Sequence, residues 1–133
     1  MVKNQNRKEI LLVDDDLDYS ELTRTRLEAS GYQVSCASNG RDALKLLEGE
    51  CQPSLIIMDI EMPDKNGLTT LININVQKGM GQQKEKLHIP VLVATGLQSE
   101  KVREVVMAQN VNGYLKKPYD SEELIQAVKS LIG

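Results

Sequence analysis

The sequence contains no tryptophan and no phenylalanine, and tyrosine, with four copies, is its sole representative of the Phe, Trp and Tyr group. The core must therefore be aliphatic, and the position of each tyrosine becomes informative. With 133 residues, the chain has the length of one domain and can bury a single core without disulfide or metal cross-links.

Cysteine and histidine are also scarce. Cys36 and Cys51 lack the spacing of a metal or redox motif, and one possible pair is too little for a secreted disulfide scaffold. A reducing cytoplasm is the expected location. His88 is the single histidine and lies in a polar stretch, so we interpret it as a solvated side chain rather than a ligand.

The chain has neither a long apolar run nor an excess of positive charge. No run approaches the ~20 residues of a membrane span, and residues 1–9 have no apolar signal core. The net charge of −3 offers no basic face for nucleic acid. We expect a protein with no membrane contact and no direct nucleic-acid binding, in which residues 1–7 form a flexible tail.

Short apolar runs alternate with amphipathic segments along the chain. The runs predict strands at residues 10–13, 32–37, 55–59, 90–94 and 112–116. Helical spacing predicts helices over 18–29, from 40, over 68–76, around 102–106 and from 120. Residues 71–76 also alternate as a strand would, but a parallel sheet needs a crossover there. The pattern predicts a single α/β domain over residues 1–133, with a doubly wound parallel sheet.

The helical spacing also predicts which side chains face the core. The expected inward residues are Tyr19, Leu22, Thr23 and Leu27 in the first helix, and Val102, Val105 and Val106 in the fourth. Asp120 is the expected N-cap of the last helix, with Glu123 completing a capping box.

Acidic side chains gather where two of the predicted strands end. Asp14 and Asp15 follow the first strand, and Asp59 ends the third. A parallel sheet brings these carboxyl ends to one edge, where open α/β sheets hold ligands. Close carboxylates repel one another, so without a cation at least one pKa should be raised. Oxygen ligands without sulfur favour a hard ion, and Mg²⁺ suits a site that shares a phosphoryl oxygen.

The other two strand ends carry groups that suit an anion. Thr95 follows the fourth strand, and the neighbouring Gly96 amide is sterically open. Lys117 follows the fifth strand and supplies a positive charge. A hydroxyl, an amide and an ammonium beside a metal site are equipped to hold a phosphoryl group.

The order and spacing of these motifs resemble the response-regulator receiver domain, the CheY-like module of two-component signalling. The motifs are the acidic strand end over 10–16, Met58-Asp59 followed by Met62-Pro63 and Gly67, Thr95 after an apolar strand, and residues 114–118. The likeness extends from about residue 8 to residue 132. It implies a flavodoxin-like fold with five parallel strands in the order 2-1-3-4-5 and five helices.

The resemblance assigns roles to the strand-end residues. It implies that Asp59 accepts a phosphoryl group from a sensor histidine kinase or a histidine phosphotransfer protein. It also implies that Asp14, Asp15, Asp59 and the backbone carbonyl of Glu61 hold Mg²⁺. Thr95 and Lys117 would contact the phosphoryl oxygens, and the Lys117-Pro118 bond would be cis.

The resemblance further implies a switch and an output. The phosphoryl group would draw Thr95 and Lys117 inward, and the ring of Tyr114 would turn into the vacated space. The surface of the fourth helix, fifth strand and fifth helix would then control a protein partner or an output domain. The charged rim expected on this surface comprises Lys101, Arg103, Glu104 and Lys116.

Three alternatives stay open. The chain could be a receiver domain cut from a hybrid kinase or longer regulator, which the long segment 77–89 favours, whereas the start at Met1 favours a free-standing protein. A Mg²⁺-dependent aspartyl phosphohydrolase would instead use Asp14 or Asp16 as its nucleophile. A scaffold that is not phosphorylated should lack an acidic or lysine position, and all are present. We expect a signalling switch that catalyses only its own phosphorylation and dephosphorylation.

The residues expected to flank attacking water predict a long-lived phosphoryl group. By the resemblance these are Glu61 and Leu97, and Leu97 cannot hydrogen-bond the water. Leu97→Glu should therefore speed self-dephosphorylation, as measured by the rate of phosphate release. An unchanged or slower rate in the variant would refute this expectation.

Overall fold

A computed structural model describes residues 7–49, 52–60, 89–96, 100–109 and 111–133. Its strands are β1 (Glu9–Val13), β2 (Gln33–Ala37), β3 (Leu55–Met58), β4 (Val91–Thr95) and β5 (Gly113–Lys116). They pair in parallel in one sheet of order β2-β1-β3-β4-β5. The predicted doubly wound sheet is confirmed, with β2 at one edge.

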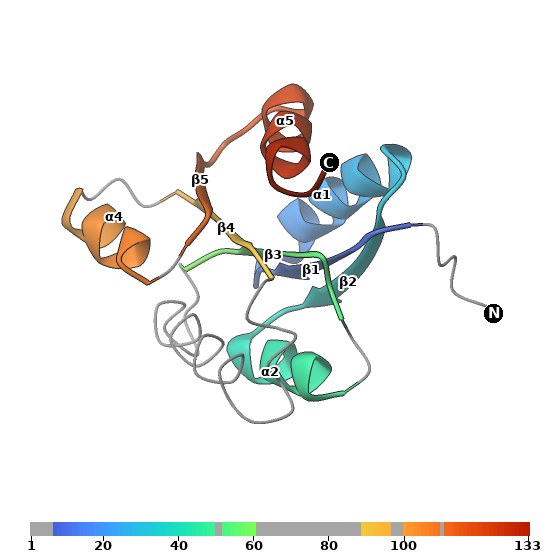
Figure 1. Ribbon diagram of the computed structural model, residues 1–133, viewed down its shortest axis with the longest axis horizontal. Coiled ribbons are helices and arrows are strands. Elements are labelled where there is room, and N and C mark those ends of the chain that lie inside the picture. The colour runs from blue at the N-terminus through green and yellow to red at the C-terminus, as the bar shows by residue number, and fades with distance from the viewer. Residues whose placement is uncertain (1–6, 50–51, 61–88, 97–99, 110) are drawn as a thin grey trace.

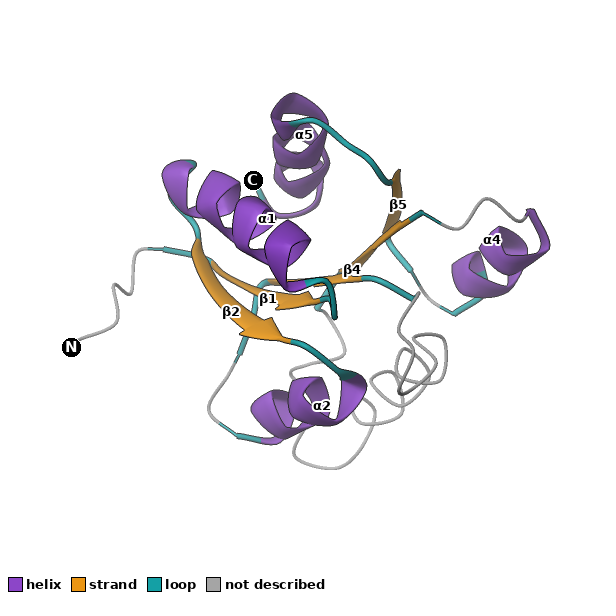
Figure 2. Ribbon diagram, turned by 180° about the vertical axis from the view of Figure 1, so that it is seen from behind, coloured by secondary structure: helices purple, strands orange, loops and turns teal. Residues whose placement is uncertain are grey.

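Helices cover both faces of this sheet. The described helices are α1 (Leu17–Ala29), α2 (Gly40–Glu48), α4 (Glu100–Met107) and α5 (Ser121–Ile132). α1 and α5 lie on one side of the sheet and α2 lies on the other (Figure 1; Figure 2). Val106 of α4 belongs to the same core cluster as Ala43 of α2. The helix expected over 68–76 lies outside the described residues.

The continuous apolar strands are explained by burial on both faces. Leu12 and Ile57 pack in the cluster under α1 and α5, whereas Val13 and Met58 pack in the cluster under α2. None of these four side chains is more than 2% exposed. A strand buried on both faces has no need of polar alternation, which is why each run reads as uniformly apolar.

The strand register determines where the acidic residues lie. Val13 pairs with Met58, so Asp14 and Asp59 leave neighbouring strands at the same level. The Asp59 N–H donates to the Val13 carbonyl at 2.9 Å, and the Asp14 N–H donates to the Ala37 carbonyl at 3.1 Å. The backbone at both strand ends is thus hydrogen-bonded, which holds the two carboxylates at one edge of the sheet.

Side-chain caps define where α1 and α5 begin. The carboxylate of Asp16 accepts from the Tyr19 N–H, so α1 starts immediately after the acidic pair. The expected capping box of α5 is present, with Asp120 and Glu123 each accepting from the other's N–H. Caps of this kind satisfy N–H groups that a helix start leaves unpaired.

Two inward side chains were predicted wrongly. Leu22 is 48% exposed and Val105 is 40% exposed. The buried stripe of α1 consists of Ser20, Thr23 and Leu27, so small polar residues face the sheet and Leu22 lies about 100° round the helix from Thr23. Thr23 and Leu27 were predicted to face inward, and Thr23 is buried with its hydroxyl hydrogen-bonded to the Tyr119 hydroxyl. The apolar pattern missed Ser20, because a small polar side chain does not count toward an apolar stripe.

Within the described part of the chain, no helix combines the length and apolar character needed to cross a bilayer.

Candidate functional site

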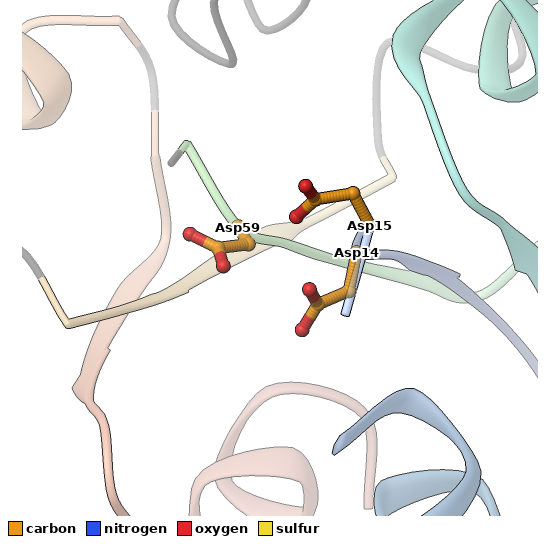
Figure 3. Close-up of side chains that lie close together, drawn as sticks. All are labelled: Asp14, Asp15 and Asp59. Atoms are coloured by element: carbon orange, nitrogen blue, oxygen red, sulfur yellow. The ribbon is translucent and has the colours of Figure 1, made fainter. Parts of the chain in front are cut away.

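Three carboxylates meet beyond the ends of β1 and β3 (Figure 3). Asp14, Asp15 and Asp59 each offer an oxygen, and these oxygens all lie within 4.8 Å of one another. Asp14 is 3% exposed and Asp59 is 5% exposed, and Asp15 is the most exposed of the three. The structure therefore brings together the three acidic side chains that the sequence placed at one edge of the sheet.

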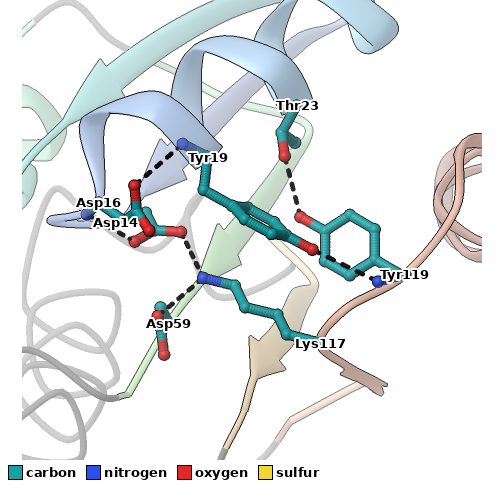
Figure 4. A network of polar contacts seen from close by, with 7 residues as sticks. All are labelled: Asp14, Asp16, Tyr19, Thr23, Asp59, Lys117 and Tyr119. Atoms are coloured by element: carbon teal, nitrogen blue, oxygen red, sulfur yellow. Dashed lines mark hydrogen bonds and ion pairs between the residues drawn. The ribbon is translucent and has the colours of Figure 1, made fainter.

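Lys117 bridges the two buried carboxylates (Figure 4). Its Nζ lies 2.6 Å from Oδ2 of Asp14 and 2.9 Å from Oδ2 of Asp59. The lysine side chain is 13% exposed, so water screens these charge-assisted hydrogen bonds only partly. The lysine that follows β5 thus reaches across the sheet edge to residues that follow β1 and β3.

The pKa values in this cluster reflect burial first. Burial raises the pKa of the Asp14 carboxyl, and hydrogen bonds from Lys117 and from the Asp16 N–H offset part of that rise. The charge of Asp59 adds a smaller increase. A raised pKa was expected from repulsion between carboxylates, but loss of hydration is the larger cause.

For Lys117, the combined effect of hydrogen bonding on the pKa is larger than the effect of burial. Burial alone would lower the pKa of the Lys117 ammonium, but its hydrogen bonds to Asp14 and Asp59 outweigh that effect and raise the pKa. Lys117 therefore stays protonated and holds the two carboxylates near each other. An ammonium between two carboxylates partly fills the electrostatic role of a cation.

The oxygen donors fit a hard divalent ion. Asp14, Asp15 and Asp59 present carboxylate oxygens without a sulfur ligand, which is the ligand chemistry of Mg²⁺. Glu61, whose carbonyl was expected to complete the set, lies outside the described residues, as does Leu97.

Thr95 and Tyr114 occupy neighbouring strands. Thr95 ends β4 with its side chain fully buried, and its carbonyl accepts from the Lys117 N–H at 2.9 Å. Tyr114 pairs with Val93 of β4 and packs against the core cluster under α2. The Arg103 guanidinium lies 5.3 Å from the centroid of the Tyr114 ring. The expected switch residue is thus held by a cation from α4.

Tyr19 and Tyr119 lie beside the site, although the sequence pattern predicted neither there. The Tyr19 ring centroid lies 4.4 Å from the Lys117 ammonium, and Tyr119 is buried two residues beyond that lysine. The helical stripe assigned Tyr19 to the core, because spacing alone does not show which charge a half-buried ring meets. One signal was available: Tyr19 lies in the first turn of a helix that starts at the acidic strand end.

Asp16 has a structural role. Its carboxylate accepts from the Tyr19 N–H at 3.0 Å, and its own N–H donates to Oδ1 of Asp14 at 3.0 Å. This aspartate, one of the two candidate nucleophiles for a phosphohydrolase, is therefore engaged in capping α1. The Lys117-Pro118 bond is cis, as the resemblance implied.

A model of the response regulator receiver domain matches residues 10–129, which is most of the chain. The chain belongs to this family. It is 32% identical over 126 residues to the polar-differentiation response regulator DivK of Brucella anthropi, covering 95% of this chain and 97% of DivK. It is 35% identical over 125 residues to the alkaline phosphatase synthesis transcriptional regulatory protein PhoP of Bacillus subtilis, covering 94% of this chain.

Solved receiver structures share the fold. The receiver domain of the sensor histidine kinase PA1611 from Pseudomonas aeruginosa superposes with a TM-score of 0.82 at 26% identity, covering 96% of this chain and 98% of that one. That structure has a magnesium ion coordinated in its active site cleft. A CheY-like receiver domain protein from Methanospirillum hungatei gives the same TM-score and identity, covering 94% of this chain and 93% of its own.

The relatives differ in length. This receiver domain spans 14% of a probable histidine kinase of Oryza sativa and 48% of PhoP, but 97% of DivK. Receiver domains therefore occur among its relatives both within longer proteins and nearly alone.

The lysine bridge predicts a specific effect on metal affinity. Lys117→Met removes a positive charge that repels a divalent cation. It also frees the carboxylates of Asp14 and Asp59 from their hydrogen bonds to the ammonium, so Mg²⁺ should bind roughly tenfold more tightly. Because the chain has no tryptophan, the titration is followed by amide chemical shifts.

The matched control is Lys116→Met. Lys116 is the exposed neighbour at the end of β5, and its loss should leave the Mg²⁺ affinity nearly unchanged. Equal affinities for wild type and Lys117→Met would contradict the proposed competition.

Proposed function

We propose that this receiver domain is the phosphoacceptor of a two-component phosphorelay and that Asp59 receives the phosphoryl group. The supporting observation is the buried Asp59 carboxylate, 2.9 Å from the Lys117 ammonium and grouped with two further carboxylates. A nucleophilic carboxylate, a cation for the transferred group and a ligand set for a metal are the parts that phosphoryl transfer requires. The donor would be a phosphohistidine of a sensor kinase or of a phosphotransfer protein.

The chemistry follows from these positions. An oxygen of Asp59 attacks phosphorus, the phosphorus–nitrogen bond of the phosphohistidine breaks, and the imidazole nitrogen keeps the bonding pair. Asp59 then carries an acyl phosphate. Asp14, Asp15 and an oxygen of Asp59 would hold Mg²⁺, which when bound neutralises charge on the phosphoryl oxygens.

Lys117 changes partners during the transfer. Its ammonium hydrogen-bonds Asp14 and Asp59 before the reaction and needs only a small movement to reach a phosphoryl oxygen on Asp59. Thr95, which ends β4 at the same edge, would donate its hydroxyl to another phosphoryl oxygen. Both residues contribute by preorganised charge and hydrogen bonding rather than by covalent chemistry.

A receiver domain within a longer regulator or hybrid kinase is the second candidate. It is favoured because this chain covers about half of PhoP and matches the receiver domain of a kinase. The downstream partner would then be an attached output domain instead of a separate protein. Two of the relatives, CpxR and PhoP, are transcriptional regulatory proteins, and the expectation that this chain does not itself bind nucleic acid stays a prediction.

The acceptor assignment predicts a single phosphoryl adduct. Incubation with acetyl phosphate and Mg²⁺ should add one phosphoryl group to wild type and none to Asp59→Asn, because the amide is a poor nucleophile. Intact mass measures the adduct. Asp15→Asn should keep the acceptor but weaken metal binding.

The control is Asp18→Asn, a change to an exposed carboxylate in the first turn of α1. It should be modified as fully as wild type. If Asp59→Asn is also modified as fully, the acceptor assignment is wrong.

The contact between Arg103 and Tyr114 predicts how the output face responds. An inward turn of the Tyr114 ring must give up the guanidinium that now lies 5.3 Å from its centroid, so α4 and β5 should change together. Amide chemical shifts are compared with Mg²⁺ alone and with Mg²⁺ and beryllofluoride, which stands in for the phosphoryl group. Shifts in α4 and β5 should exceed those in β2.

The matched variant is Arg103→Lys, which keeps the charge and loses the planar group that stacks on a ring. It should populate the inward Tyr114 conformation more readily at the same beryllofluoride concentration. Changes confined to the loops around Asp14, Asp59 and Lys117 would refute this route for the signal.

A further inference from the structure

The ring of Tyr19 lies against the ammonium of Lys117, a contact that the phosphoryl-transfer steps above do not use (Figure 4). Nζ is 4.4 Å from the ring centroid, within the roughly 6 Å over which a cation is attracted to an aromatic face. Because the lysine side chain is 13% exposed, the attraction is only partly screened by solvent.

The ring is fixed by its own contacts. The Tyr19 hydroxyl accepts from the Tyr119 N–H at 3.3 Å. The two rings pack edge to face, with centroids 5.4 Å apart and planes at 82°. The Tyr119 hydroxyl in turn shares a hydrogen bond of 3.0 Å with Thr23 of α1. Tyr19 therefore joins α1 to the backbone that follows Lys117, and its ring has a defined orientation.

The neighbours of the ammonium respond differently when the metal and the phosphoryl group bind. In the described part of the chain these neighbours are Asp14, Asp59 and the Tyr19 ring. The proposed metal engages both carboxylates, and the proposed phosphoryl group is carried by Asp59. The ring offers no ligand oxygen to a hard cation from its face, so its attraction for the ammonium persists when the carboxylates are taken.

We propose that Tyr19 is a positioning residue for phosphoryl transfer: its ring keeps the Lys117 ammonium beside Asp59 while Asp14 and Asp59 are engaged by metal and phosphoryl group. The inference rests on the proposed function of Asp59. It assigns the tyrosine a role that the helical stripe, which placed it in the core, did not show.

The first test is made on wild-type protein. Protons on the Cε of Lys117 should resonate upfield of those of Lys116, because they lie near the face of a ring. The shift should be present in the metal-free protein and should persist with Mg²⁺ and beryllofluoride. The signal is assigned to Lys117 by its absence from the spectrum of Lys117→Arg. Loss of the upfield shift when Mg²⁺ and beryllofluoride bind would overturn the proposal, because the ring and the ammonium would then no longer be in contact.

The second test separates ring from hydroxyl. Tyr19→Leu removes the ring, and beryllofluoride affinity and the rate of phosphorylation by acetyl phosphate should fall about 3- to 10-fold. Mg²⁺ affinity should stay within about twofold of wild type, because no metal ligand is changed. Tyr19→Phe keeps the ring and should restore most of the beryllofluoride affinity. Wild-type affinity and rate in Tyr19→Leu would overturn the proposal.

The matched control is Tyr32→Leu. Tyr32 is a buried tyrosine of the cluster under α1 and α5, and its hydroxyl donates to the Gly133 carbonyl at 3.5 Å, away from the acidic strand ends. Its loss should lower thermal stability and leave beryllofluoride affinity unchanged. This control separates a general loss of packing from the loss of the ring contact with Lys117.

A double-mutant cycle tests whether Tyr19 acts through the lysine. In a Lys117→Met background, Tyr19→Leu should cause no further loss of beryllofluoride affinity. An equal loss in both backgrounds would overturn the proposal, since the tyrosine would then act elsewhere. If wild type is not phosphorylated at Asp59, the proposed function fails. If wild type is phosphorylated and Tyr19→Leu behaves the same, only the positioning role fails.

Discussion

The concentration of negative charge at one edge of the sheet is the constraint on which the rest of the site depends. Asp14 and Asp59 are buried at the ends of adjacent strands, and the register of β1 and β3 keeps them at the same level. Buried carboxylates are costly unless a cation or hydrogen bonds compensate them. Lys117 provides that compensation, with both carboxylates within hydrogen-bond distance. The fifth strand therefore has to end where the first and third do.

The start of α1 is built around the same constraint. Asp16 caps the helix and donates its N–H to Asp14, so the turn that begins α1 also orients a carboxylate of the site. Tyr19, in the first turn, then lies beside Lys117. A change in the position of this helix start would alter the cap, the Asp14 hydrogen bond and the ring contact together. The site and α1 are thus one structural unit, although the charged residues of the site follow β1, β3 and β5.

Much of this arrangement could be predicted from the sequence. Apolar strands followed by Asp14 and Asp59, and a fifth strand followed by Lys117, imply a common edge once the sheet is parallel, because parallel strands end on the same side of the sheet. The α5 capping box was equally readable, since a cap depends on local spacing. The spacing of strand ends in a parallel sheet is therefore a strong signal even without a structure.

The errors arose where tertiary contacts override a pattern. Leu22 has the right spacing for the core but is exposed, while Ser20, which the apolar pattern left out, is buried. In the same way, Tyr19 contacts Lys117, which follows β5, and no local periodicity reveals this contact. Helical spacing finds the buried face to within one residue, but the identity of the neighbours depends on how the elements pack.

The charges at this site explain why phosphorylation should be felt beyond Asp59. Three carboxylates and Lys117 carry about −3 and +1, and a bound Mg²⁺ brings the sum near zero. Converting Asp59 to an acyl phosphate replaces one negative charge by about two, which leaves an excess of about one negative charge. In a poorly hydrated site such an excess of negative charge attracts any hydrogen-bond donor that can move.

Thr95 is fully buried at the end of the next strand, so its hydroxyl is well placed to respond. Tyr114 lies on the strand beside it. In the proposed function, the path from Asp59 to the α4 surface would begin as a charge imbalance that Lys117 and a bound Mg²⁺ do not neutralise.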